Sequence, residues 1–153
     1  MSEVSTLSDK TLQQIVDRVT LYEQMVTLAE PIFSIEGKRL EEVLKEHAHN
    51  LITYDTLLQE CKSIEDLVRS RLDKVKAAEW ERLNERHNRS LNTKDIEAYI
   101  AGIPQYTEVY GVLLIVVEIK RKLEAIVNAL TSMGWSLNNI VKLRVAQLDH
   151  ITM

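Results

Sequence analysis

Apolar residues recur at steps of three and four along most of the chain, which is the spacing of one face of an α-helix. The first such stripe begins near Ser8, where Thr6 and Ser8 are candidate caps, and Pro31 ends it near Glu30. Its members are Leu12, Ile15, Val16, Val19, Tyr22, Met25 and Val26. The pattern therefore predicts a helix over residues 8–30.

A second and much longer stripe follows without a proline. Its steps alternate between four and three, as in a heptad seam, through Leu40, Leu44, His47, Leu51, Tyr54, Leu58 and Cys61. After a phase shift it continues through Ile64, Val68, Leu72 and Val75. The stripe predicts a helix over residues 36–86, and the phase shift allows a break or bend near residues 61–64. A straight helix of about 50 residues would be roughly 75 Å long, so it must extend past the body or pair, most simply with a second copy.

Polar residues at 88–93 predict a loop after this helix. Asn92 or Thr93 can cap a short helix over residues 94–100, because a short side-chain oxygen accepts from the free backbone N–H groups of a first turn. Gly102 and Pro104 then predict a second break.

The third long helix is predicted over residues 105–133, and over 109–119 it is apolar nearly all round. A helix that is hydrophobic on every face is buried on every face. We therefore expect this helix to join copies of the chain through Val109, Tyr110, Val112, Leu113, Val116, Val117, Leu123, Ile126, Val127 and Leu130. Gly134 then stands where a C-terminal cap belongs, and Ser136 is expected to begin a last helix.

These elements predict an all-α fold of long helices with coiled-coil-like packing that assemble into a homo-oligomer. The chain has 153 residues but only 4 Gly and 2 Pro, too few for the frequent turns of a sandwich or barrel. Three segments are expected: an N-terminal helix (1–33), a long helical arm with a basic end (34–92) and C-terminal oligomerisation helices (93–153). The alternative is a monomeric bundle in which the second long helix folds back.

Charge is unevenly distributed along the chain, whose net charge is −4. Residues 1–68 carry thirteen acidic and six basic side chains, whereas residues 69–89 carry four acidic and seven basic ones. No global positive field draws such a protein to nucleic acid, so any binding depends on a local patch.

The basic stretch combines cations with an aromatic ring. Its members are Arg69, Arg71, Lys74, Lys76, Trp80, Arg82, Arg86 and Arg89. Basic side chains follow a phosphate backbone and an aromatic ring stacks an exposed base, so we take these residues as a candidate single-stranded DNA site. The alternative is that Trp80 packs into the core and the arginines pair with Glu79, Glu81 and Glu85 at helical spacings.

Residues that would carry catalysis or bind a metal are not apparent. Cys61 is the one cysteine and lies on the heptad seam, and no glycine-rich phosphate loop is present. His47 and His49 are two residues apart, which places them on different helix faces. The carboxylate pairs Glu41–Glu42 and Glu65–Asp66 have the pattern of solvated faces. We expect a non-enzyme without cofactor or metal.

No targeting or membrane segment is expected. The N-terminus has neither a basic nor an apolar signal region, and the longest apolar run, residues 109–117, is far shorter than the ~20 residues that span a bilayer. The chain is therefore predicted to be cytoplasmic. Lys120, Arg121 and Lys122 span too wide an arc to share one helix face, and we expect them to mark where the apolar helix leaves its buried surroundings.

The C-terminal half resembles a known family on short motifs. An aliphatic helix holds the runs 106–114 and 125–130, and the segment 132–144 follows with a Gly134–Trp135 pair and a basic Arg144. This order is similar to the UvsY-like recombination mediators of T4-like tailed phages. Lys74, Lys76 and Trp80 fall where that family has a basic and aromatic helix end. The family's glycine-rich loop is replaced here by a helix-compatible, arginine-rich stretch.

The resemblance implies a non-catalytic function in phage DNA recombination and repair. Members of the family form rings of six or seven copies and bind single-stranded DNA. They help to load a RecA-like recombinase onto strands covered by single-strand DNA-binding protein, here in the host cell cytoplasm. The first 30 residues have no counterpart in the family and are a candidate partner-binding helix. The competing hypothesis is a structural coiled-coil scaffold or adaptor with no nucleic-acid role.

Overall fold

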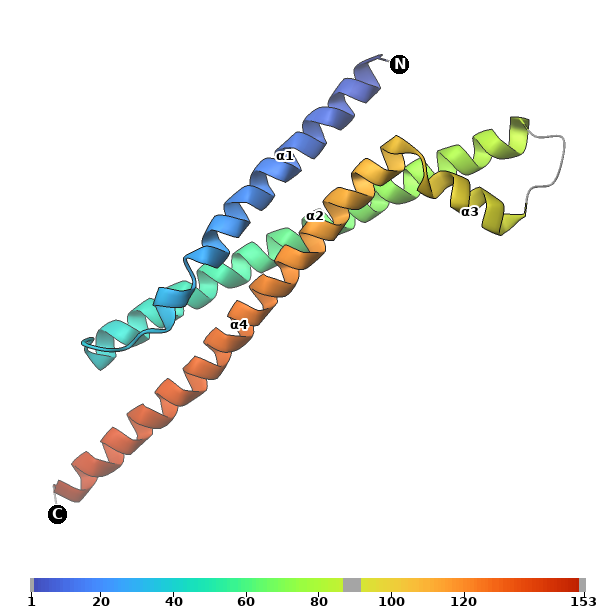
Figure 1. Ribbon diagram of the computed structural model, residues 1–153. Helices are drawn as coiled ribbons and strands as arrows, with labels where there is room; N and C mark the ends of the chain where they lie inside the picture. The colour runs from blue at the N-terminus through green and yellow to red at the C-terminus, as the bar shows by residue number, and fades with distance from the viewer. Residues whose placement is uncertain (1, 87–91, 152–153) are drawn as a thin grey trace. The chain divides into compact units, whose positions relative to one another are not determined.

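The computed structural model describes residues 2–86 and 92–151, with side chains for 11–85 and 92–148. These residues form four α-helices and one short 3₁₀ turn and contain no strand, so the all-α prediction is confirmed. The elements are α1 (Ser2–Thr27), η1 (Glu30–Phe33), α2 (Leu40–Arg86), α3 (Thr93–Ala101) and α4 (Pro104–Ile151). Figure 1 shows the long helices α1, α2 and α4 and the short α3, which follows α2 and precedes α4 in the chain.

The chain divides into two compact units, and each is assembled from segments distant in sequence. Unit 1 combines Met1–Leu21 with Glu60–Lys120, and unit 2 combines Tyr22–Gln59 with Arg121–Met153. The helices α1, α2 and α4 each contribute to both units.

The core of unit 1 is formed by the apolar stripes predicted from the sequence. In α1, Leu12, Ile15 and Val19 are buried. In α2 and α4 the fully buried side chains include Val68, Cys61, Val109 and Val116. The Cys61 thiol lies 3.7 Å from the main-chain oxygen of Val116, so this cysteine is a core residue as expected. Burying these side chains supplies the main free energy that holds the helices together.

A small cluster fixes α3 between its neighbours in unit 1. The Asn92 side chain caps α3 by accepting from the N–H of Lys94, as predicted. Leu83, Ile96 and Ile100 are buried there. Gly102 ends α3 and Pro104 begins α4, which confirms the predicted break.

Unit 2 is built around the first half of α2 and the second half of α4. Its buried side chains include Val43, Tyr54, Leu123 and Leu130. The Tyr54 hydroxyl donates to the main-chain oxygen of Met25 at 2.7 Å, and burial raises the pKa of this phenol.

The start of the heptad seam differs from the prediction. Val43 is buried, whereas the predicted seam residue Leu44 is 38% exposed. The helix begins only at Leu40, after Gly37 takes a positive φ of 72° that favours glycine. The expected break near residues 61–64 is absent, because α2 is continuous through this region.

The predicted end of the third helix at Gly134 is wrong. Helix α4 continues past it to Ile151, and the Ser136 hydroxyl donates to the main-chain oxygen of Ser132 instead of capping a new helix. A Cβ at position 134 would lie 3.0 Å from Cε1 of His47. His47 Nε2 lies 2.7 Å from the carbonyl oxygen of Leu130 and donates to it. A side chain at position 134 would therefore require the imidazole of His47 to shift, so glycine here allows close packing and does not form a turn.

Helix α1 also departs from its predicted bounds. It begins at Ser2 and ends at Thr27, before the expected end near Glu30. Pro31 lies inside the 3₁₀ turn η1, where its missing N–H costs nothing because the first turn leaves that group unbonded.

Candidate nucleic-acid interface

The predicted DNA-binding residues lie in the C-terminal part of α2, within unit 1. At 100° per residue, Arg71, Lys74 and Arg82 fall within an arc of about 80°, which we call the Lys74 side. Arg69 and Lys76 fall together on a different part of the helix surface, which we call the Arg69 side. Arg86 ends α2 with an undescribed side chain, and Arg89 lies outside the described residues. The candidate site is thus divided between two sides of one helix.

A buried carboxylate organises the Arg69 side. Glu65 is only 7% exposed, although the sequence predicted a solvated face for it. Its oxygens accept from Arg69 Nη2 at 2.8 Å and from Lys120 Nζ at 2.7 Å. The hydrogen bond from Lys120, supported by Arg69, outweighs the effect of burial and holds the pKa of Glu65 below its ordinary value. These three side chains join α2 to α4 within unit 1, so Arg69 and Lys120 serve the fold.

The Lys74 side borders a groove between α1 and α2. Lys74 is exposed, and among the described side chains no carboxylate pairs with it. The groove has a volume of about 280 Å³, and Thr11 and Ile15 of α1 line it together with Leu67, Arg71 and Lys74 of α2. The sequence analysis named α1 only as a candidate partner-binding helix and assigned none of its residues to the DNA site, because a groove between two helices is not visible in the periodicity of either one.

Arg82 is held within its own chain. Its guanidinium lies 2.7 Å from Oε2 of Glu79, and this carboxylate, with a further hydrogen bond to Tyr99, raises the pKa of Arg82. The alternative prediction of a helical pair with Glu79 is therefore confirmed for this arginine. The side chain is 42% exposed, so it still presents charge to solvent.

Trp80 does not stand free beside the cations. It is half-buried and packs against the cluster of Leu83, Ile96 and Ile100, as the alternative prediction had it. Lys76 is exposed and has no carboxylate partner among the described side chains.

The exposed aromatic rings near this end of unit 1 are tyrosines that the sequence analysis did not assign to the DNA site, although it assigned Tyr110 to oligomerisation. Tyr99 is 52% exposed and adjoins Arg82. Tyr110 is 43% exposed, and its ring stacks on Tyr106 with centroids 6.0 Å apart. The spacing of four between Tyr106 and Tyr110 was a usable sequence signal, because residues four apart are neighbours on a helix.

The predicted oligomerisation residues divide between the core and the surface. Five of them are buried against the chain's own helices, namely Val109, Leu113, Val116, Leu123 and Leu130. Tyr110 is exposed, and Val112, Val117, Ile126 and Val127 are half-buried. The apolar run also presents Leu114 and Ile115, which are 53% and 48% exposed and were not selected from the sequence.

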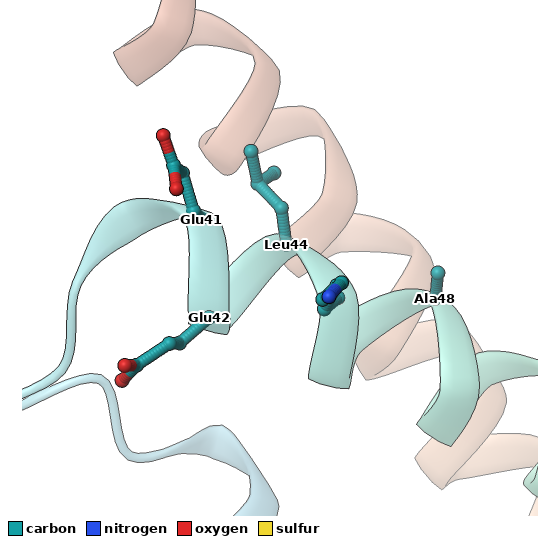
Figure 2. A pocket seen from close by; sticks show the side chains of 5 residues that line it. Glu41, Glu42, Leu44 and Ala48 are labelled. Carbon is teal, nitrogen blue, oxygen red and sulfur yellow. The ribbon is translucent and has the colours of Figure 1, made fainter.

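A second pocket lies in unit 2 beside the first turns of α2. It has a volume of about 550 Å³ and is lined by Glu41, Glu42, Leu44, Lys45 and Ala48. In Figure 2 Glu41 and Leu44 point to one side of the helix, while Glu42 points away from them. Its two carboxylates would repel phosphate, so we do not count this pocket with the candidate DNA-binding residues. Within the described residues no cluster of three or more potential metal ligands occurs.

No single helix in the described part of the chain is long and apolar enough to cross a membrane. One pair of helices, Thr93–Ala101 and Pro104–Leu148, meets the length and composition requirement only when taken together, and it is bent by 75°.

Comparison of the chain with protein-family models, curated protein sequences and solved structures finds no match. The functional argument therefore depends on the residues of this chain.

Proposed function

We propose that the protein is a non-catalytic recombination mediator. It binds single-stranded DNA as a homo-oligomer and promotes loading of a RecA-like recombinase in place of single-strand DNA-binding protein. The observation that carries this proposal is Lys74, an exposed cation without a carboxylate partner among the described side chains, beside Arg71 on one side of α2. A row of cations on one helix face suits a flexible polyanion.

Oligomerisation is supported by the outward face of the apolar run in α4. Tyr110, Leu114 and Ile115 lie close together on this helix and remain exposed in the single chain. Contiguous exposed apolar side chains mark interaction sites more often than isolated ones do. A second copy covering this face would bury the three side chains and would repeat the basic stretch around the assembly.

Repetition of the basic stretch makes a weak contact useful. A single copy offers few cations within a chain of net charge −4, so its binding would be weak. Joining several copies raises the effective concentration of each further contact, and avidity can increase by about 10²–10⁴. A strand held at many weak points can be released stepwise, which is what transfer to a recombinase requires.

The binding test is a titration of a labelled oligothymidylate at two salt concentrations. Combined replacement of Arg71, Lys74 and Arg82 by Ala should lower affinity and flatten the salt dependence, because removing one phosphate interaction lowers the logarithmic slope by about 0.7 for single strands. The matched control replaces Lys45, Lys62 and Lys94 by Ala, which removes the same charge elsewhere. Equal affinity and slope for both triple variants would reject the site.

The oligomer is tested by light scattering after size exclusion. We expect several copies for the wild type and one copy for the double variant Leu114→Glu, Ile115→Glu, because buried carboxylates without partners prevent association. Ile52→Glu, at an exposed α2 position, is the control. A wild type that elutes as a single copy at micromolar concentration would contradict the proposal.

The coiled-coil scaffold or adaptor remains the second candidate function. It is favoured by the carboxylate partners that Arg69 and Arg82 have within the chain, because paired cations bind phosphate less readily. This function predicts a stable oligomer that binds no oligonucleotide even at low salt. The titration above therefore distinguishes the two functions directly.

A further inference from the structure

The groove between α1 and α2 joins two surfaces that differ in chemistry. Its lining is largely apolar, with Ile15 and Val68 buried at its base and Leu67, which is 61% exposed, at its α2 wall. Its rim carries Arg71 and Lys74. A large apolar side chain that stays exposed beside two cations is suited to a ligand that is itself apolar on one part and anionic on another.

A nucleotide within a single strand has this combination. The phosphate is anionic, and the base is a flat ring whose faces are apolar and exposed once the strand is unstacked. The Lys74 side of α2 supplies cations next to the groove, so a strand following these cations passes the groove opening. Charge complementarity therefore favours the strand itself over a neutral ligand.

The size of the groove limits what can enter it. Its volume of about 280 Å³ lies just below the usual range for small-molecule pockets. It can take a group of the size of one base but not a folded partner. The side walls come from two helices, so the groove exists only while α1 is packed on α2 within unit 1.

We propose that this groove accepts one unstacked base of single-stranded DNA while Arg71 and Lys74 contact the adjoining phosphates. This proposal rests on the proposed DNA-binding function and adds to it. It makes α1, for which the sequence resemblance offers no counterpart, a part of the DNA-binding site. Thr11 and Ile15 form the α1 wall of the groove, and Leu67 belongs to its α2 wall.

The first test compares an oligothymidylate with an abasic phosphodiester oligomer of the same length. We expect the full-length wild type to bind the base-bearing strand about tenfold more tightly, as for a single apolar base contact. Leu67→Ser should reduce this preference about fivefold without changing the salt slope, because it removes apolar surface and no charge. The control is Ile52→Ser, which lies on the same helix and is 68% exposed, so any general effect of losing an exposed aliphatic side chain appears in both variants.

The second test addresses the α1 wall. Thr11→Gln places a longer neutral side chain in the groove and should lower the preference for the base-bearing strand. Thr20→Gln, at another exposed threonine of α1, should leave it unchanged. Circular dichroism on all four variants shows whether each keeps its helices.

The outcomes separate this inference from the proposed function. If the wild type binds DNA but Leu67→Ser and Thr11→Gln match their controls, the groove proposal is overturned and the DNA function stands. If the wild type binds neither oligomer at low salt, both fail. If an acidic peptide binds more tightly than either oligomer and Leu67→Ser abolishes its binding, the groove belongs to a protein partner and the proposal is likewise overturned.

Discussion

The Arg69 side and the Lys74 side of α2 both carry cationic side chains, but the surroundings of these side chains differ. On the Arg69 side, Arg69 and Lys120 of α4 both bind the buried carboxylate of Glu65, so these two cations are used within unit 1, whereas Lys76 is exposed. On the Lys74 side, Arg82 pairs with Glu79, but Lys74 has no carboxylate partner among the described side chains and adjoins an open groove. A count of cations along the chain therefore overestimates the charge available to a ligand, because pairs within α2 and the contact between Lys120 and Glu65 already use some of these cations.

Removing the buried carboxylate of Glu65 should have the largest effect of the changes that test this comparison, and the effect is on the free energy of unfolding. We expect Glu65→Gln to lower the free energy of unfolding by about 2 kcal/mol, less than for a fully buried pair because Arg69 is half exposed. Asp66→Asn, at the exposed neighbouring position, should change it by no more than about 0.5 kcal/mol. Urea unfolding at one fixed protein concentration measures both values, and equal values would show that Glu65 does not hold unit 1 together.

The next effect concerns DNA binding by single cations. We expect Lys74→Ala to weaken oligothymidylate binding about fivefold and to reduce the salt slope by about 0.7, the value for one phosphate interaction with a single strand. Arg69→Ala, which removes the same charge from the other side, should change binding much less. Fluorescence anisotropy across a salt series measures both. If Arg69→Ala has the larger effect, the two sides have been assigned the wrong way round.

Changing the pH should have a smaller effect on the free energy of unfolding. The pKa of Glu65 is lower in the folded chain than its ordinary value of 4.5, so the unfolded state binds the proton more tightly. Its stabilising contribution is therefore complete above about pH 4.5 and is lost as the pH falls through the lower folded pKa. The difference in unfolding free energy between wild type and Glu65→Gln should narrow over this acid range. A difference that stays constant down to pH 3 would mean that the pKa of Glu65 is not lowered.

The smallest effect is the stability change on removing the arginine of this cluster. The Arg69 side chain is 54% exposed and lies four residues from Glu65, so solvent screens the pair. We expect Arg69→Ala to lower the free energy of unfolding by about 0.5 kcal/mol. Lys120→Ala should cost more, because Lys120 is only 22% exposed. Thermal unfolding of both variants checks the order.

Local signals in the sequence predicted much of the fold. Asn92 as a cap, Gly102 with Pro104 as a break and the stripe from Leu12 to Val19 all depend on neighbours within a few residues. Such features depend on local backbone preferences and on helical periodicity, and both can be inferred from residues that are close in the sequence.

The sequence could not predict features that depend on contacts between distant segments. Glu65 has the pattern of a surface carboxylate, and its burial depends on Lys120, 55 residues away. Trp80 has the composition of a stacking platform, yet the cluster around Ile96 and Ile100 half-buries it. The groove beside Lys74 needs α1, and nothing in the periodicity of α1 or α2 indicates which faces meet.

The contact between Gly134 and His47 links two positions that would have to change together. In an α-helix the carbonyl of Leu130 already accepts from the N–H of residue 134, and here it also accepts from the imidazole. An alanine at 134 alone would press on the ring, whereas a smaller residue at 47 would first make room for it. The two positions are therefore coupled, and Gly134→Ala should cost less stability in a chain that already carries a smaller residue at position 47.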